Sequence, residues 1–278
     1  MDAAERAAVN PYLQHKVPLG GAEAGGPVDG ARAMTRDEGL RAFMLQVYNL
    51  MFAGLCLTGL TAWFVHDLAV TSDFALAGRI DGSTVPVNDT EYLTAIGVWL
   101  WGTPISYAVC FGPLVLCLIC GPIHGLPARV GGVIYAIIAT LIGVAFSSLA
   151  LVYTGSSITM VFFVTAAAFG GLSLLGYTTR ADLTGWGSFL WMGLVGIIMA
   201  AVLNFWLASD ALRFAICAIG VVVFAGFTAY DTQQIKEAYR ADMDADERNA
   251  IAIAGALDLY LDFVNLFRFL LHFLGDDE

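Results

Sequence analysis

The sequence predicts an all-α fold, a multi-pass transmembrane helical bundle with seven spans. Of its 278 residues, 58% are hydrophobic and only 13% are charged, and the mean hydropathy is +0.73, so most of the chain is too apolar for a water-soluble surface. Helices are the expected spanning form, because backbone N–H and C=O groups need partners within the segment where water is absent. Seven apolar runs reach about the 20 residues that a helix needs to cross a bilayer: 41–65, 96–120, 130–153, 157–177, 187–208, 211–236 and 249–274.

The segment before the first span is expected to be a disordered cytoplasmic tail. Residues 1–38 contain three prolines and a Gly-Gly-Ala-Glu-Ala-Gly-Gly run, a composition that buries too little apolar surface to offset the entropy of ordering. A single transmembrane domain is expected over residues 39–278. Lys and Arg cluster before the first span and in the connections on the same side of the membrane, which predicts a cytoplasmic N-terminus.

The net charge excludes one class of partner. The formal charge of −11 argues against nucleic acid, because no basic surface is available to displace counterions from phosphates. The lipid bilayer is the expected environment, and no tightly bound cofactor is expected.

Three carboxylates stand inside the last two apolar segments. Asp231 lies in the sixth span, and Asp258 and Asp262 lie in the seventh. An aspartate at the centre of a membrane helix costs about 2.5–3.5 kcal/mol even on lenient scales. These three residues are therefore candidate functional residues.

The spacing of the carboxylates predicts that they face one another. Asp258 and Asp262 are four residues apart, so they share one helix face. The short connection between the sixth and seventh spans predicts adjacent antiparallel helices, which brings Asp231 toward that face. If both straight helices begin at the same level, Asp231 is about 12 Å deep, Asp258 about 17 Å and Asp262 about 23 Å. Asp258 is then the more level partner of Asp231, and Asp262 needs a tilted helix.

Paired carboxylates at membrane depth have two chemical uses. In a low dielectric they cannot both ionise cheaply, so they share a proton and act as a pH sensor. If both are ionised, Asp231 and Asp262 offer oxygen ligands to a hard cation such as Ca²⁺, with Tyr260 and Asn265 nearby. The alternative is that Asp231 lies at a hydrated helix end and that Asp262 only packs between helices.

Three separated motifs resemble the Bax inhibitor-1 family, also called transmembrane Bax inhibitor motif proteins, in its bacterial branch. The resemblance extends in order over residues 38–275. The motifs are Ala229-Tyr-Asp-Thr-Gln-Gln-Ile235 in the sixth span, Leu259-Tyr-Leu-Asp-Phe-Val-Asn-Leu-Phe267 in the seventh, and Gly176-Tyr-Thr-Thr-Arg-Ala-Asp-Leu-Thr-Gly-Trp-Gly187 between the fourth and fifth.

The resemblance implies a fold whose last helix is central, in the bacterial inner membrane. It also implies a pH-sensitive calcium leak channel or transporter, with Ca²⁺ and protons as its ions and the pair Asp231 and Asp262 as its gate. Asp258 stands where the family more often has a small polar residue. The supporting residues in the matched motifs are Tyr230, Tyr260 and Asn265.

One element of the family is missing from this chain. Some members hold an arginine in the second span that closes on the aspartate pair, but residues 96–120 contain no Arg or Lys. Only Arg41 or Arg129 could take its place, by reaching in.

Two other functions compete with the channel. The bacterial resemblance implies that the chain binds and restrains a membrane-anchored AAA protease, with the N-terminal tail as the docking segment. An intramembrane aspartyl protease is the more remote alternative. It needs Gly-x-Gly-Asp on the second helix, whereas Gly255-Ala-Leu-Asp258 has leucine at the second glycine, and no proline follows Pro127 to supply the late Pro-Ala-Leu element. We therefore do not expect an enzyme.

Overall fold

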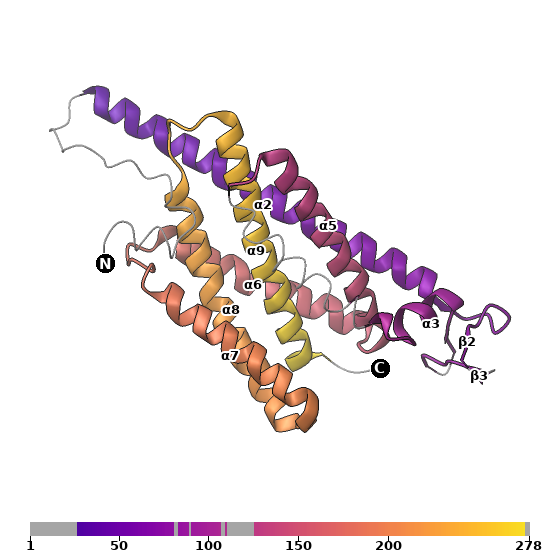
Figure 1. The fold of residues 1–278 in the computed structure, drawn as a ribbon. Coiled ribbons are helices and arrows are strands. Elements are labelled where there is room, and N and C mark those ends of the chain that lie inside the picture. Colours follow the sequence, from indigo (N-terminus) through magenta and orange to yellow (C-terminus); the bar gives the residue numbers. More distant parts are fainter. Residues whose placement is uncertain (1–26, 81–82, 89, 107–108, 110–124, 276–278) are drawn as a thin grey trace. The chain divides into compact units, whose positions relative to one another are not determined.

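Helices dominate the computed structural model, which describes residues 27–80, 83–88, 90–106, 109 and 125–275 (Figure 1). The prediction of an all-α fold is confirmed for this part of the chain, since the strands are two-residue pairings. The helices are α2 (Pro27–Ala69), α3 (Ala95–Trp101), α5 (Ala128–Phe146), η2 (a 3₁₀ helix, Ser147–Leu151), α6 (Gly155–Thr178), α7 (Trp186–Leu207), α8 (Asp210–Ala238) and α9 (Ala245–Leu274), and the strands are β1 (Val70–Thr71), β2 (Arg79–Ile80), β3 (Ser83–Thr84) and β4 (Tyr92–Leu93).

Six helical segments within the described residues are long and apolar enough to cross a membrane. They are α2 from Asp37 onward, α5 continued by η2, α6, α7, α8 and α9, and each overlaps one predicted span. The remaining predicted span, 96–120, lies largely outside the described residues, and α3 covers only its beginning. A total of seven spans, and the transmembrane domain over 39–278 that would contain them, stay predictions.

Helix α2 begins earlier than the sequence suggested. The predicted tail ended at residue 38, whereas the helix starts at Pro27. Proline suits the first turn of a helix, because its fixed φ is helical and no intrahelical partner is needed for a backbone N–H there. The Ala-Arg-Ala-Met run at 31–34 then supplies strong helix formers. The rest of the predicted tail, residues 1–26, lies outside the described residues.

The chain forms two compact units, and helices α2 and α6 each contribute to both. The first, here called the carboxylate unit, comprises the described residues up to 51, then 125–131 and 162–273. The second, here called the hairpin unit, comprises the described residues of 52–122, then 132–161 and the last described residues after 273.

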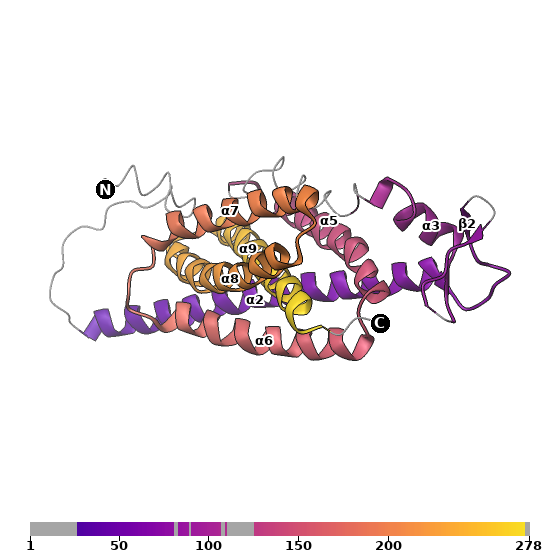
Figure 2. The ribbon, with the colours of Figure 1, turned by 90° about the horizontal axis from the view of Figure 1, so that it is seen from below.

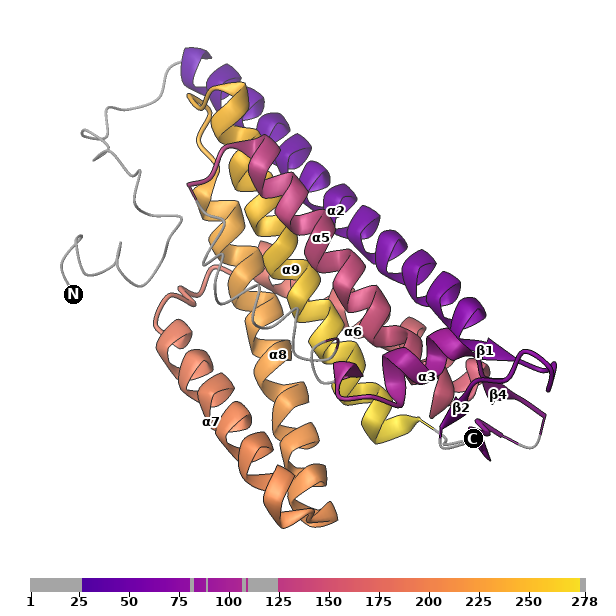
Figure 3. The same cartoon turned by 45° about the vertical axis from the view of Figure 1, so that its right-hand side comes forward.

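The carboxylate unit is built around helices α8 and α9. Helix α8 lies between α7 and α9 (Figures 1 and 3). Helix α9 is the most deeply packed candidate span within the described residues, because 67% of its apolar stretch is buried, against 33% or less for the others. This burial supports a central last helix. The core between α7, α8 and α9 consists of Leu190, Ile197, Ile216, Val223, Phe224, Phe227, Tyr230 and Leu266.

Aromatic and polar contacts join α6 and the first part of α2 to this core. The rings of Phe162 and Phe169 on α6 meet that of Phe263 on α9 edge-on, at centroid distances of 5.5 and 5.6 Å. Nearer the beginning of α9, Gln46 Nε2 on α2 donates a 2.9 Å hydrogen bond to Asn249 Oδ1. These contacts hold α9 at two levels along its length.

The hairpin unit combines the second part of α2 with α5 and short strands. Strand β1 pairs antiparallel with β4, and β2 pairs antiparallel with β3. Thr58 Oγ1 on α2 donates a 3.0 Å hydrogen bond to the carbonyl of Ala139 on α5. Gly143 lets these two helices approach closely, because a Cβ there would lie 2.7 Å from the Thr58 carbonyl oxygen.

Large apolar side chains are exposed on the outer faces of the helices. Trp206 is 72% exposed, Phe205 71% and Val222 70%. A water-soluble protein rarely exposes apolar surface so extensively, whereas a bilayer solvates it. The chain is an integral membrane protein.

Candidate functional site

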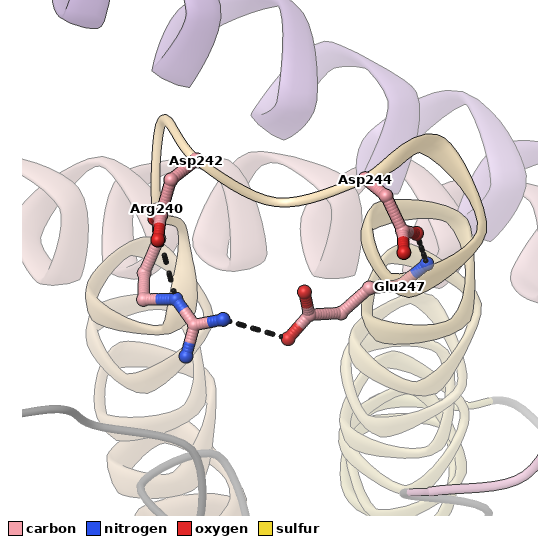
Figure 4. Close-up of polar contacts among 4 residues, drawn as sticks. All are labelled: Arg240, Asp242, Asp244 and Glu247. Atoms are coloured by element: carbon pink, nitrogen blue, oxygen red, sulfur yellow. Dashed lines mark hydrogen bonds and ion pairs between the residues drawn. The ribbon is translucent and has the colours of Figure 1, made fainter.

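The connection between α8 and α9 sets the relative position of the two helices that carry the carboxylates (Figure 4). Arg240 Nη2 donates a 2.8 Å charge-assisted hydrogen bond to Glu247 Oε1 across the turn, and its Nε lies 3.6 Å from Asp242 Oδ1. Asp244 Oδ1 accepts a 2.7 Å hydrogen bond from the backbone N–H of Glu247 and thereby caps the first turn of α9. The turn is thus held at both helix ends.

A close contact further along the two helices brings α8 and α9 together. Gly255 on α9 packs against Ile235 on α8 so tightly that a Cβ at Gly255 would lie 2.8 Å from Ile235 Cγ1. Because the two helices are antiparallel, Asp231 on α8 and Leu259 on α9 lie level with each other, four residues from this contact. Asp258 precedes Leu259 by one residue and Asp262 follows it by three, so both lie within about one turn of the level of Asp231.

The structure joins Asp231 to Asp262. Their side chains form a hydrogen bond to each other, and the charge of Asp258 acts on both. Asp262 is only 4% exposed, while Asp231 and Asp258 are partly buried. A hydrogen bond between two carboxyl groups requires a proton on one of them. The arrangement can therefore hold one shared proton between the two helices.

Level alone does not decide which aspartate pairs with Asp231. Helix α9 begins beyond the level at which α8 ends (Figures 1 and 3). Asp258 lies one residue from the level of Leu259 and Asp262 three residues from it, so Asp258 stays the more level of the two. The hydrogen-bonded partner is nonetheless Asp262, and Asp258 acts through its charge.

The three predicted supporting residues lie in different surroundings. Tyr230 is buried in the core and directs its hydroxyl at α7, where a Cβ on Gly187 would lie 2.7 Å from it. Tyr260 is completely buried in α9. Asn265 donates its amide Nδ2 to the carbonyl of Leu261 on its own helix at 2.8 Å. The supporting role of these three residues stays a prediction.

A chain of hydroxyl groups beside the pair was not predicted. Tyr48 Oη lies 2.6 Å from Ser173 Oγ, and Ser173 Oγ lies 3.0 Å from Thr232 Oγ1. Thr232 donates its hydroxyl to the carbonyl of Thr228 at 2.7 Å. Since each hydroxyl has one proton, Ser173 must donate to Thr232 and Tyr48 to Ser173. The chain therefore links α2 and α6 to the residue that follows Asp231.

Two glutamines after Asp231 were also missed. Gln233 holds the connection between α6 and α7, because its Oε1 accepts from Leu183 N–H and its Nε2 donates to the carbonyl of Ala181, both at 2.8 Å. Gln234 is 1% exposed, and neither atom of its amide has a hydrogen-bond partner in the described part of the chain. The sequence signal was available, since Thr-Gln-Gln inside an apolar span is as unusual as the aspartates.

Neither arginine suggested as a substitute latch reaches the pair. Arg41 and Arg129 are both exposed, and neither forms an ion pair with the described residues. Within the described residues, no group of three or more His, Cys, Asp or Glu side chains is placed to hold a metal ion. Calcium binding by Asp231 and Asp262 therefore stays a prediction.

Comparison with known proteins agrees with the motifs and the helical fold. The family model described as inhibitor of apoptosis-promoting Bax1 matches residues 40–278. The chain belongs to the Bax inhibitor-1 family. Among its relatives in this family is an uncharacterized protein of Caulobacter vibrioides, 44% identical over 259 residues, which covers 91% of this chain and 95% of the relative.

Two further bacterial relatives span nearly the same length. Inner membrane protein YbhL of Escherichia coli is 38% identical over 240 residues, covering 86% of this chain and 93% of the relative. Protein RP147 of Rickettsia prowazekii, also uncharacterized, is 38% identical over 246 residues, covering 87% and 92%. The resemblance to the Bax inhibitor-1 family that the motifs indicated is thus confirmed.

Proposed function

We propose that this Bax inhibitor-1 protein is a pH-sensitive calcium leak channel or transporter, gated by Asp231 and Asp262. The observation that carries the proposal is the hydrogen bond between these two carboxyl groups, which joins α8 to α9 inside the carboxylate unit. A membrane protein tolerates the cost of such a pair where it serves the passage of an ion or a proton.

Proton occupancy would act on the contact between the two helices. With one shared proton, the carboxyl groups attract each other through a hydrogen bond. Without it, two adjacent negative charges, with Asp258 as a third, repel each other in a medium of low dielectric. A change of pH therefore changes the α8–α9 contact.

The same oxygen atoms would serve Ca²⁺ when the proton leaves. Calcium prefers carboxylate and carbonyl oxygens and tolerates irregular geometry. Asp262 Oδ2 is buried without a hydrogen-bond partner among the described residues, which leaves one oxygen atom available. Proton and cation would then compete for one site.

The inner membrane of a bacterium is the proposed location, since YbhL of Escherichia coli is named as an inner membrane protein. We place the N-terminus in the cytoplasm on the distribution of Lys and Arg. Regulation of a membrane-anchored AAA protease stays a prediction, since most of the N-terminal tail proposed as its docking segment lies outside the described residues.

Calcium entry into liposomes tests the proposal. The full chain is reconstituted, and Ca²⁺ influx is recorded at about pH 6–8, where a coupled carboxyl pair can titrate. We expect a pH-dependent influx that Asp231→Asn and Asp262→Asn each flatten. Asp210→Asn is the matched control, because it removes an exposed aspartate at the opposite end of α8. No influx at any pH from folded protein, or equal effects of all three variants, would overturn the proposal.

A further inference from the structure

A groove between α2 and α6 lies in the carboxylate unit, outside the carboxyl pair. Its volume is about 500 Å³, within the range of small-molecule sites. Leu45, Gly170 and Leu174 in its walls are exposed. The complete lining is Arg41, Met44, Leu45, Tyr48, Phe169, Gly170, Ser173, Leu174 and Tyr177. The groove is thus mostly apolar, with polar groups concentrated among a few side chains.

The polar groups divide between the two ends of the groove. Arg41 lies near the beginning of the α2 span and Tyr177 one residue before the end of α6, so both belong to the level where a span leaves the hydrocarbon. Phe169 lies about 12 Å further along α6. The groove therefore has a cationic end at the membrane interface and an apolar end within the membrane.

The interfacial end of the groove carries positively charged side chains. Arg41 is exposed and forms no ion pair with the described residues. Lys236 adds a second cation, because its Nζ donates a 2.7 Å hydrogen bond to the Tyr177 carbonyl and lies 5.5 Å from the centre of the Tyr177 ring. A guanidinium group next to an open apolar groove complements an anion that carries an alkyl chain.

We infer that this groove binds an anionic phospholipid, with the phosphate on Arg41 and one acyl chain along Leu45, Leu174 and Phe169. The bilayer supplies such molecules at the outer face of every span, and arginines at the interface attract their headgroups. Glycine at position 170 leaves room for the chain, since a Cβ there would have no atom within 4 Å.

A lipid bound in the groove would affect the surroundings of the carboxyl pair. Tyr48 and Ser173 line the groove and are also the first two members of the hydroxyl chain that ends at Thr232. Lipid binding would hold these hydroxyl groups in place against α8, next to Asp231. This consequence rests on the proposed function, whereas lipid binding itself does not.

Native mass spectrometry of the delipidated full chain tests the inference. Phosphatidylglycerol and phosphatidylcholine with identical acyl chains are added separately, and bound lipid is counted. A basic residue near the membrane surface contributes about 1 kcal/mol toward anionic lipid, so we expect about fivefold tighter retention of phosphatidylglycerol. Arg41→Ala should remove this preference, and Arg129→Ala, which removes an exposed arginine outside the groove, should keep it.

A second pair of variants tests the apolar part of the groove. Gly170→Leu fills the space along α6 and should reduce retention of both lipids. Gly171→Leu is its matched control, because the neighbouring glycine also has open space around a Cβ but does not line the groove. If Arg41→Ala does not fold, Arg41→Gln keeps the polar side chain without its charge.

Several results would overturn the inference. Equal retention of the two lipids, an unchanged preference in the Arg41 variant, or equal effects of Gly170→Leu and Gly171→Leu would each do so. Displacement of phosphatidylglycerol by glycerol phosphate would show that the phosphate group alone is the ligand. A mass corresponding to two protein chains, lost in Gly170→Leu, would show that a second copy occupies the groove.

Discussion

The packing of α6 against α8 beside Asp231 depends on Gly176. A Cβ at this position would collide with the carbonyl oxygen of Ala229 and lie 2.9 Å from its carbonyl carbon and 3.0 Å from its Cα. Carbon atoms in contact are normally about 3.5–4.0 Å apart, so Gly176→Ala forces the two backbones apart by roughly 0.5–1 Å. Because a backbone cannot rotate away as a side chain can, we expect overpacking to cost about 1–3 kcal/mol.

Gly171→Ala on the same helix is the control for this substitution. A Cβ there has no atom within 4 Å, so both variants gain the same helix propensity, up to about 1 kcal/mol, and only one is overpacked. The free energy of unfolding, measured in mixed micelles by circular dichroism, should therefore be about 1–3 kcal/mol lower for Gly176→Ala than for Gly171→Ala. Equal unfolding free energies would refute the close α6–α8 crossing.

Three further substitutions test contacts around the site. Ser173→Ala interrupts the hydroxyl chain and should lower the free energy of unfolding by about 1–3 kcal/mol, whereas the exposed Ser156→Ala on α6 should change it little; equal losses would contradict the chain. Gln233→Leu releases the connection between α6 and α7, so trypsin should cut faster after Arg180, and an unchanged rate would show that the glutamine does not hold the loop. Asp244→Ala removes the α9 cap at a cost of about 1 kcal/mol, and amide exchange in the first turn of α9 should accelerate; unaltered exchange there would speak against the cap.

The spans could be predicted from the sequence because a bilayer imposes a strong constraint on composition. A helix must be apolar over about 20 residues to cross it, and six such helices lie where the apolar runs predicted them. The same constraint made Asp231 and Asp262 conspicuous, since a carboxylate inside an apolar run is energetically costly. The structure brings these two residues together.

The details of the site depend on how helices are placed, which periodicity does not determine. Spacing showed that Asp258 and Asp262 share a face, but it did not show which of them forms the hydrogen bond with Asp231. The close approach of Gly255 to Ile235 and the hydroxyl chain through Ser173 are contacts between different helices. The groove likewise arises from two helices that are far apart in the sequence (Figure 2).

The start of α2 shows another limit of composition. A segment rich in Gly and Pro predicted disorder up to residue 38, yet the helix begins at the last of these prolines. Average composition over a long window conceals a short run of helix formers. A proline can begin a helix just as a polar capping residue can.

Infrared spectroscopy of the carboxyl groups can show whether Asp231 and Asp262 hold one proton between them. The C=O stretch of a protonated carboxyl group is recorded in the reconstituted protein as the pH is raised through about 6–8. We expect a band that fades with rising pH in the wild type and is lost or shifted in both Asp231→Asn and Asp262→Asn, but not in Asp210→Asn. A band that is absent in the wild type, or that neither substitution of the pair alters, would contradict a shared proton.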